Sequence, residues 1–422
     1  MDRYLITGRR RLEGSIRASG AKNATLPILT ACLLSDGHCN IEEVPKLQDV
    51  EVMQGVLESL GCKVIWTANT MQIDCTGVHL AEVPSDMMRR MRASNLVMGP
   101  LLGRFGEVKV WSPGGCAIGT RPMDQHIKGL KLMGAEIKER HGFIEAKASK
   151  LKGVNIHLDM PSVGATENLM MAAVLAEGTT LIRNAAREPE IIDLQNFLNA
   201  IGARVRGAGL DVIRIDGVKN LGGTTHSVIP DRIEAGTHMV AAAITRGDIE
   251  VRNIIPEHVE PVTAKLREAG ADITVGEDWV RVKVTGPLKA VDIRTLPYPG
   301  FPTDMQPQMM ALLATIEGTS IISESIFENR YQHVNELRRM GANVRVEGRA
   351  AVVQGVEFLD GAFVEATDLR AGAALVLAGL AAEEATIVEN VEHIDRGYEN
   401  LEAKYGDLGA RITRIASTGG VV

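Results

Sequence analysis

The sequence predicts an α/β protein made of repeated units of helices and short strands. A phrase of one apolar residue, a glycine, a small residue, a variable residue and a β-branched residue occurs six times. Its glycines are Gly61, Gly134, Gly202, Gly270, Gly341 and Gly409, which recur every 68 to 73 residues. A period of that length is typical of a supersecondary unit. We therefore interpret features shared by all copies as scaffold, and features of a single copy as candidates for chemistry.

Each copy begins with an apolar segment rich in Ala and Leu, whose length and composition favour a buried helix. These segments span residues 24–34, 96–102, 168–175, 239–244, 309–316 and 369–380. A glycine follows in most copies, and then a short β-rich strand such as 180–183 or 248–251. An amphipathic helix such as 262–268 and the glycine phrase with its hairpin complete the copy. This alternation predicts helices packed behind sheets.

The length of the chain divides the copies into two domains. A chain of 422 residues is too long for one ordinary hydrophobic core, so two domains with three copies each are expected. The third copy ends near Gly222-Gly223, and Val228-Ile229-Pro230 is interpreted as the crossing into the second half. We expect an N-terminal domain over 22–229 and a C-terminal domain over 1–21 and 230–422.

Composition and charge exclude several functional classes. The net charge of −7 argues against nucleic acid as a partner. No apolar run reaches the roughly 18 residues of a membrane span, so we expect no membrane insertion and a cytoplasmic location. The 5 cysteines lack Cys-x-x-Cys spacing, which argues against a disulfide framework and a zinc site and favours a reducing compartment. The 10 histidines form no His-x-x-x-His pair, so no metal is expected.

The second copy differs from the others in one loop. Its glycines Gly106 and Gly134 stand 28 residues apart, whereas the corresponding separation elsewhere is 23 or 24. The extra residues lie in Ser112-Pro113-Gly114-Gly115-Cys116-Ala117-Ile118-Gly119-Thr120-Arg121-Pro122. Because loops on rigid scaffolds often carry function, the thiol of Cys116 is a candidate for chemistry. A mobile insertion with an incidental cysteine is the alternative interpretation.

Polar and charged residues stand where the apolar helices are expected to begin. Helix N-termini attract anions, and converging helix starts with nearby Lys and Arg would form an anion-binding face. The basic candidates are Lys22, Lys46, Arg92, Arg121, Arg187, Arg330 and Arg396. A solvated surface position is the alternative for each of them. For the acids Asp231, Asp304 and Asp368, helix capping is the alternative to catalysis.

Seven motifs in order along the chain resemble the enolpyruvyl transferase family, and within it the enzymes that act on UDP-N-acetylglucosamine. They are Lys22-Asn23, Met91-Arg92-Ala93-Ser94, Pro113-Gly114-Gly115-Cys116 with Gly119-Thr120-Arg121-Pro122, Ser162-Val163-Gly164-Ala165-Thr166, Phe301-Pro302-Thr303-Asp304-Met305-Gln306, Phe327-Glu328-Asn329-Arg330 and His393-Ile394-Asp395-Arg396-Gly397-Tyr398. The resemblance spans essentially the whole chain. It implies a pair of inside-out α/β barrels built from six βαβαββ units, three in each domain, with the first strand of the chain in the C-terminal domain.

The resemblance also implies a reaction. Such enzymes transfer the enolpyruvyl group of phosphoenolpyruvate to the 3-hydroxyl of the sugar by addition and elimination and release phosphate, the first committed step of peptidoglycan synthesis. Cys116 resembles the acid that protonates the methylene carbon, and a thiol with an ordinary pKa of about 8.5 holds its proton at neutral pH. Asp304 resembles the base for the sugar hydroxyl, and Lys22 and Arg396 complete the implied catalytic set. No cofactor is implied.

The remaining implied ligands divide between the two substrates. Those for phosphoenolpyruvate are Lys22, Asn23, Arg92, Arg121, Arg370 and Arg396. Those for UDP-N-acetylglucosamine are Asn23, Arg92, Arg121, Pro122, Met123, Asp124, Gln125, His126, Ser162, Val163, Gly164, Asp304, Ile326 and Arg330. The loop around Cys116 is expected to close over the bound sugar, and the resemblance predicts that the epoxide fosfomycin alkylates Cys116. This chain has Met160-Pro161 where some relatives carry a lysine, which puts one contact to the diphosphate in doubt.

Two other functions stay open from the sequence. An enolpyruvyl transferase that acts on a phosphorylated cyclohexene acid would share the fold and the chemistry, but the Pro-Gly-Gly-Cys loop favours the nucleotide sugar. A protein that binds the nucleotide sugar and regulates without turnover is opposed by the presence of Lys22, Cys116, Asp304 and Arg396.

Overall fold

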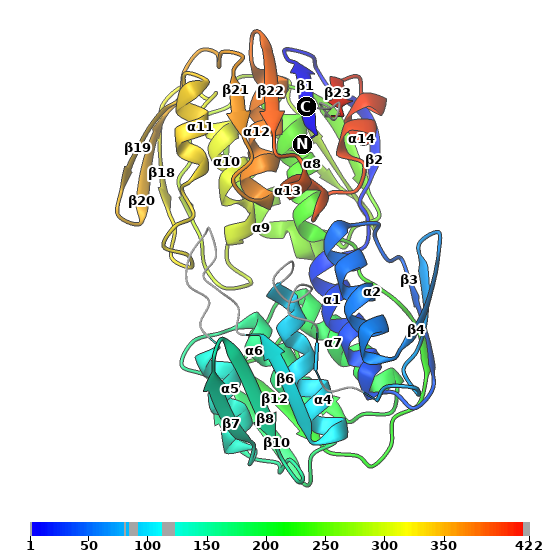
Figure 1. Cartoon of the computed structure of the whole chain (residues 1–422). Helices are drawn as coiled ribbons and strands as arrows, with labels where there is room; N and C mark the ends of the chain where they lie inside the picture. The colour runs from blue at the N-terminus through cyan, green and yellow to red at the C-terminus, as the bar shows by residue number, and fades with distance from the viewer. Residues whose placement is uncertain (1, 80–81, 84–91, 112–122, 417–422) are drawn as a thin grey trace. The chain divides into compact units, whose positions relative to one another are not determined.

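The computed structural model describes residues 2–79, 82–83, 92–111 and 123–416, without the side chains of residues 92–94. These residues form two compact units (Figure 1). We call the described part of residues 20–229 the N-terminal unit, and residues 2–19 with 230–416 the C-terminal unit. Each unit has its own hydrophobic core. Within the described ranges, every helix is too short or too polar to cross a membrane.

The described residues of the N-terminal unit form three sheets, with strand orders β13-β3-β5-β4, β6-β8-β7 and β11-β12-β10-β9. The strands are β3 (His38–Glu42), β4 (Lys63–Thr67), β5 (Thr70–Asp74), β6 (Glu107–Trp111), β7 (Glu136–Arg140), β8 (Phe143–Lys147), β9 (Asn155–His157), β10 (Thr179–Arg183), β11 (Val205–Arg206), β12 (Val212–Asp216) and β13 (Thr224–Ser227). The helices are α1 (Lys22–Ala31), η1 (Cys32–Leu34), α2 (Gln48–Leu60), η2 (Arg92–Val97), α4 (Met98–Phe105), α5 (Asp124–Leu132), α6 (Val163–Ala173) and α7 (Pro189–Ala200), where η marks a 3-10 helix.

The C-terminal unit also has three sheets over its described residues, with strand orders β15-β16-β14-β2, β17-β18-β20-β19 and β21-β22-β1-β23. The strands are β1 (Arg3–Thr7), β2 (Glu13–Arg17), β14 (Asp248–Arg252), β15 (Asp272–Val275), β16 (Trp279–Lys283), β17 (Ile293–Arg294), β18 (Thr319–Ser323), β19 (Asn343–Glu347), β20 (Ala350–Gln354), β21 (Phe363–Glu365), β22 (Ala385–Glu389) and β23 (Arg411–Ile415). The helices are α8 (Arg232–Ile244), α9 (Pro256–Glu268), η3 (Thr303–Met305), α10 (Gln306–Leu313), α11 (His333–Arg339), α12 (Leu369–Ala381), α13 (Glu392–Asp395) and α14 (Leu401–Asp407).

The four-stranded sheets share one pairing pattern. In the first of them, β3 runs parallel to β13 and antiparallel to β5, which pairs in turn with β4. In the last, β22 runs parallel to β21 and antiparallel to β1, which pairs with β23. The first strand of the chain thus completes a sheet made otherwise of residues after 360. Mixed sheets alternating with helices confirm the predicted α/β class.

The apolar segments form the predicted buried helices. They fall in α1 with η1, η2 with α4, α6, α8, α10 and α12. In α8 every residue from Ile233 to Ile244 is buried, and in α12 every residue from Arg370 to Leu380. A helix that is apolar on nearly all sides is stable only inside a core, so these helices supply the interior of each unit.

The repeated glycine phrase marks the end of a helix. All six of its glycines have a positive φ, between 85° and 109°. At Gly270, which follows α9, the glycine amide donates to the carbonyl of Arg267 and the next amide, of Ala271, donates to Leu266. A left-handed residue at this place satisfies the last carbonyls of a helix, and glycine adopts it without a steric penalty. The phrase recurs because each of the six copies must end a helix before a strand begins.

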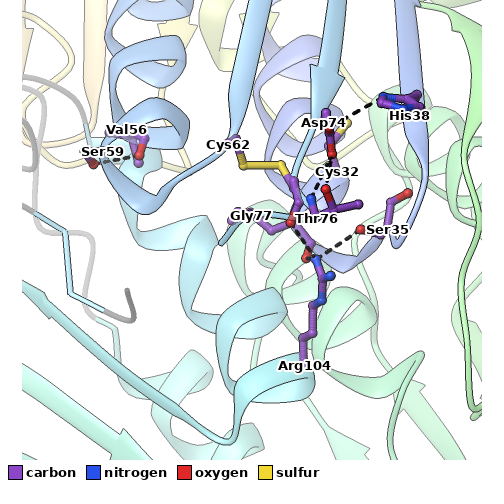
Figure 2. The surroundings of a disulfide bond; sticks show 12 residues. Cys32, Ser35, His38, Val56, Ser59, Cys62, Asp74, Thr76, Gly77 and Arg104 are labelled. Carbon is purple, nitrogen blue, oxygen red and sulfur yellow. Dashed lines mark hydrogen bonds and ion pairs between the residues drawn. A yellow bond between two sulfur atoms is a disulfide. The ribbon is translucent and has the colours of Figure 1, made fainter. Parts of the chain in front are cut away.

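One expectation about the cysteines was wrong, because a disulfide joins Cys62 and Cys75 (Figure 2). The two residues flank the β4–β5 hairpin, in which Lys63 pairs with Asp74. The spacing of the cysteines in the sequence did not indicate the bond. The register of the hairpin brings the two cysteines opposite each other, and that register is seen only in the structure. Cys32 and Cys39 are buried free thiols.

Arg104 of α4 holds the chain beside this disulfide. Its Nη1 donates to the carbonyl oxygens of Leu33 and Cys75 at 2.7 and 3.2 Å. It also donates to the carbonyl oxygen of Ser35 at 3.0 Å (Figure 2). One guanidinium group therefore ties the end of β5 to the connection between α1 and β3.

Candidate active site

The predicted site residues are distributed over both units. In the N-terminal unit, Lys22 and Asn23 begin α1, Met123 to His126 lie at the start of α5, and Ser162 to Gly164 at the start of α6. In the C-terminal unit, Asp304 lies in η3, Ile326 and Arg330 follow β18, Arg370 lies in the first turn of α12, and Arg396 follows α13. Cys116, Arg121 and Pro122 lie outside the described residues, as does the side chain of Arg92, whose backbone begins η2.

Lys22 is held by a carboxylate from a neighbouring helix. Its Nζ lies 3.2 Å from Oδ2 of Asp49, which stands in the first turn of α2. Both residues are buried, with 8% and 3% of their surface exposed. A buried ammonium group is costly without an anionic partner, so Asp49 fixes the position of the Lys22 charge. Sequence reasoning missed Asp49, because an acid in the first turn of a helix is common for reasons of the helix dipole alone.

His126 joins the starts of α5 and α6. Its Nδ1 lies 3.1 Å from the side-chain nitrogen of Asn168, which also donates to the carbonyl of Asn95 at 2.9 Å. Burial lowers the pKa of His126 to about 4, so the imidazole is neutral at pH 7 and Nδ1 can accept. The Cβ of any residue replacing Gly164 would approach the His126 ring to 3.4 Å. The ring thus packs directly beneath one of the predicted sugar ligands.

Ser162 and Gln125 fix the same region through the backbone. The hydroxyl oxygen of Ser162 accepts from the amide of Ala165 at 3.4 Å and caps α6. The side-chain oxygen of Gln125 accepts from the amide of Asp159 at 2.9 Å. Gln125 and His126 are buried, whereas Asp124 is exposed. The predicted residues at the start of α5 therefore differ in how open they are to a ligand.

In the C-terminal unit two buried guanidinium groups flank the carboxylate of Asp304. Nη2 of Arg330 donates to Oδ1 at 2.9 Å, and Nε and Nη2 of Arg370 donate to Oδ2 at 3.2 Å each. The arginine side chains are 2% and 3% exposed, and that of Asp304 is 26% exposed. Guanidinium groups suit carboxylate and phosphate oxygens, so the chemistry of this pair fits the binding of an anion.

Arg370 keeps its positive charge in this buried position. Burial alone would lower its pKa, but the neighbouring Tyr398, Asp304 and Asp231 outweigh that effect and raise it. The guanidinium carbon lies 5.4 Å from the centre of the Tyr398 ring. The Tyr398 hydroxyl lies 2.9 Å from that of Thr237 and accepts from the side chain of Gln308 at 3.2 Å. Thr237 of α8 and Gln308 of α10 thus hold the Tyr398 hydroxyl, and Tyr398 in turn packs against Arg370.

The capping interpretation separates the three acids. Asp231 accepts from the amides of Ile233 and Glu234 at the start of α8, and Asp368 caps α12 in the same way. Capping is therefore confirmed for these two. It was wrong for Asp304, because neither η3 nor α10 has a side-chain cap and the Asp304 carboxylate binds arginines instead.

Glu324 is a further residue that sequence reasoning missed. It directly follows β18, is 1% exposed, and accepts from the hydroxyl of Thr303 at 3.0 Å. No spacing or motif pointed to it, since its partners are defined only by the folded loop. No group of three or more His, Cys, Asp or Glu is arranged for a metal ion within the described part of the chain.

Known proteins match this chain over nearly its full length. The family model described as EPSP synthase (3-phosphoshikimate 1-carboxyvinyltransferase) matches residues 6–405. UDP-N-acetylglucosamine 1-carboxyvinyltransferase 1 of Carboxydothermus hydrogenoformans is 59% identical over 415 residues, which cover 98% of this chain and 99% of that protein. The protein of the same name from Symbiobacterium thermophilum is 58% identical over 422 residues, 98% of this chain and 95% of that protein.

Solved structures share the fold. The crystal structure of the enolpyruvyl transferase NikO from Streptomyces tendae has a TM-score of 0.88 at 25% identity and covers 98% of both chains. EPSP synthase from Acinetobacter baumannii has a TM-score of 0.77 at 20% identity, covering 99% of this chain and 100% of that one. This chain therefore belongs to the enolpyruvyl transferase family of the EPSP synthase model, and within it to the UDP-N-acetylglucosamine 1-carboxyvinyltransferases.

Proposed function

We propose that this protein transfers the enolpyruvyl group of phosphoenolpyruvate to the 3-hydroxyl of UDP-N-acetylglucosamine and releases phosphate, the first committed step of peptidoglycan synthesis. The observation that carries the proposal is identity of 51% to 59% over nearly the whole chain to proteins named for this activity. The paired guanidinium groups of Arg330 and Arg370 support it, because both substrates are anions.

The proposed roles follow the motifs. Cys116 protonates the methylene carbon of phosphoenolpyruvate, and Asp304 accepts the proton of the sugar hydroxyl. The two arginines hold the Asp304 carboxylate in place, because Oδ1 accepts one hydrogen bond from Arg330 and Oδ2 accepts two from Arg370. Lys22 and Arg396, with Arg92, Arg121 and Arg370, neutralise the phosphoenolpyruvate charges, so that the leaving phosphate is stabilised.

The architecture, the domain bounds and the location are proposed in the same way. Three βαβαββ units in each domain would form an inside-out α/β barrel, which the shared pairing pattern of the sheets supports. Domains over 22–229 and over 1–21 with 230–422 are supported by compact units that change at residues 19–20 and 229–230. The remaining sugar ligands at the starts of α5 and α6 stay part of this proposal, as does a cytoplasmic location.

The decisive experiment measures phosphate release from phosphoenolpyruvate with UDP-N-acetylglucosamine as acceptor. We expect release by the wild type and its loss in Cys116→Ala, because the acid is missing. Fosfomycin should add its mass to the peptide that contains Cys116 and to no peptide of the variant. A wild type that releases no phosphate would contradict the proposal.

3-Phosphoshikimate is the acceptor to test beside the nucleotide sugar, because the matching family model is named for it. We expect no phosphate release with this acceptor. Release with 3-phosphoshikimate and none with UDP-N-acetylglucosamine would assign the chain to the other activity of the family.

A further inference from the structure

A buried carboxylate organises the loop that follows β18. Oε1 of Glu324 accepts from the backbone amides of Ile326 and Phe327 at 2.8 and 3.1 Å. Oε2 accepts from the hydroxyl of Thr303 at 3.0 Å. The amide of Glu324 itself donates to the carbonyl of Arg349 at 2.8 Å, which holds its backbone against the end of the neighbouring hairpin. Glu324 is thus fixed by the sheet and in turn fixes two other segments.

The loop of residues 324–330 is attached to η3 at both of its ends. At its first residue, Glu324 binds Thr303, and at its last residue, Arg330 binds the adjacent Asp304. Between these two attachments lies Ile326, whose amide is held by Glu324. The carboxylate of Asp304 and the backbone of Ile326 therefore have a defined relative position, although the two residues are far apart in the sequence.

We propose that Glu324 is a positioning residue for the sugar substrate, acting through Thr303 on Asp304 and through two amides on Ile326. The inference rests on the proposed function, in which Asp304 and Ile326 both contact UDP-N-acetylglucosamine. A reacting hydroxyl must meet its base at hydrogen-bond distance, and displacements near 1 Å cost about a hundredfold in rate. Loss of the Glu324 contacts releases η3 and the loop, whereas Lys22, which is proposed to hold phosphoenolpyruvate, is held separately by Asp49.

The chemistry of the three donors defines the matched variants. A carboxylate only accepts, which suits two N–H groups and one O–H group that converge on it. Glutamine keeps one oxygen for the two amides, and the Thr303 hydroxyl can rotate to accept from its nitrogen. Glu324→Gln should therefore preserve the positions, whereas Glu324→Ala removes all three contacts. At the other partner, Thr303→Ser keeps the hydroxyl and Thr303→Val removes it with little change of shape.

The kinetic test uses the Thr303 pair, because these variants leave the buried carboxylate and the fold in place. We expect Thr303→Val to lower kcat/KM for UDP-N-acetylglucosamine by about tenfold to a hundredfold. The KM for phosphoenolpyruvate should stay within about twofold, and Thr303→Ser should retain most of the activity. Equal losses in Thr303→Ser and Thr303→Val, or a Thr303→Val enzyme within twofold of an active wild type, would overturn the inference.

Hydrogen exchange supplies a readout that does not depend on activity. In Glu324→Ala the amides of Ile326 and Phe327 should exchange faster by at least tenfold, because their acceptor is gone. Glu324→Gln and the exposed control Glu317→Ala should match the wild type. Unchanged exchange in Glu324→Ala would overturn the positioning role whatever the kinetics. Absence of phosphate release by the wild type, with the expected exchange pattern, would instead refute the proposed function and leave the structural part of the inference standing.

Discussion

The candidate site residues of the two units are held in different ways. In the C-terminal unit they hold one another, since Arg330 and Arg370 both donate to Asp304 and their side chains are almost fully buried. In the N-terminal unit the candidates stand at helix starts and are held by other residues. Asp49 binds Lys22, and Asn168 binds His126.

The difference teaches how each half tolerates change. A cluster of mutually bound charges is built before substrate arrives, and removal of its carboxylate, Asp304, leaves two buried positive charges side by side. Where each helix start is held by a separate contact, the loss of one contact disturbs only that helix start. The N-terminal unit also contains the Cys62–Cys75 disulfide. The C-terminal unit cannot form a disulfide, because residues 2–19 and 230–416 contain no cysteine.

Asp304→Asn should abolish most of the activity by changing the centre of the charge cluster. In the proposed mechanism the amide cannot take up the sugar proton, and the substitution also removes the negative charge that Arg330 and Arg370 share. We expect kcat for phosphate release to fall by about a thousandfold. Asp368→Asn is the matched control, because asparagine caps a helix as well as aspartate does. An Asp304→Asn enzyme within tenfold of the wild type would remove the distinction between this acid and the capping acids.

Reduction of the Cys62–Cys75 disulfide should destabilise the N-terminal unit. The bond closes a loop with a sequence separation of 13 residues, which corresponds to about 3 kcal/mol of unfolding free energy. A dithiol reductant should lower the melting temperature of the wild type by several degrees. The variant Cys62→Ser/Cys75→Ser should start from the lower temperature and no longer respond. An equal response in both proteins, or free thiols at both positions before reduction, would contradict this prediction.

Acid should weaken the contact between α5 and α6 through His126. The unfolded imidazole takes up a proton below pH about 6.5, whereas burial keeps the folded one neutral until its pKa of about 4. Stability contributed by neutral His126 is therefore present above pH 6.5 and is lost as the pH falls toward 4. Between pH 6.5 and 5 the loss is about 2 kcal/mol. In His126→Asn, thermal unfolding should depend less on pH over this range, and an unchanged dependence would rule the prediction out.

Asp49→Asn should have the smallest effect, because it loosens one contact at a helix start. Lys22 then loses its buried anionic partner at 3.2 Å and shifts. If Lys22 binds phosphoenolpyruvate, its KM should rise about tenfold while kcat changes little, which corresponds to about 1.4 kcal/mol. Glu51→Ala, an exposed position on the same helix, is the control. A large fall in kcat with unchanged KM would show that the candidate residues of the two units respond alike.

Much of the fold could be predicted because its signals are local. Helices that are apolar all round, and the glycine that must end a helix with positive φ, can be recognised within a few residues. The contact between Lys22 and Asp49 and the contact between Glu324 and Thr303 could not be predicted. In each pair the two residues become neighbours only through tertiary packing. The disulfide was missed for the same reason, since the register of the hairpin places Cys62 opposite Cys75.

Asp231 and Asp304 show where the limit lies. Both precede apolar helices, and the sequence by itself determined that an acid stands at each helix start. Only the tertiary structure decided that Asp231 accepts from the amides of its own helix, while Asp304 binds guanidinium groups 26 and 66 residues away. A helix cap depends on backbone within one turn, and the local sequence encodes it. An ion pair between buried side chains depends on where separate elements meet, and that is fixed when the core is packed.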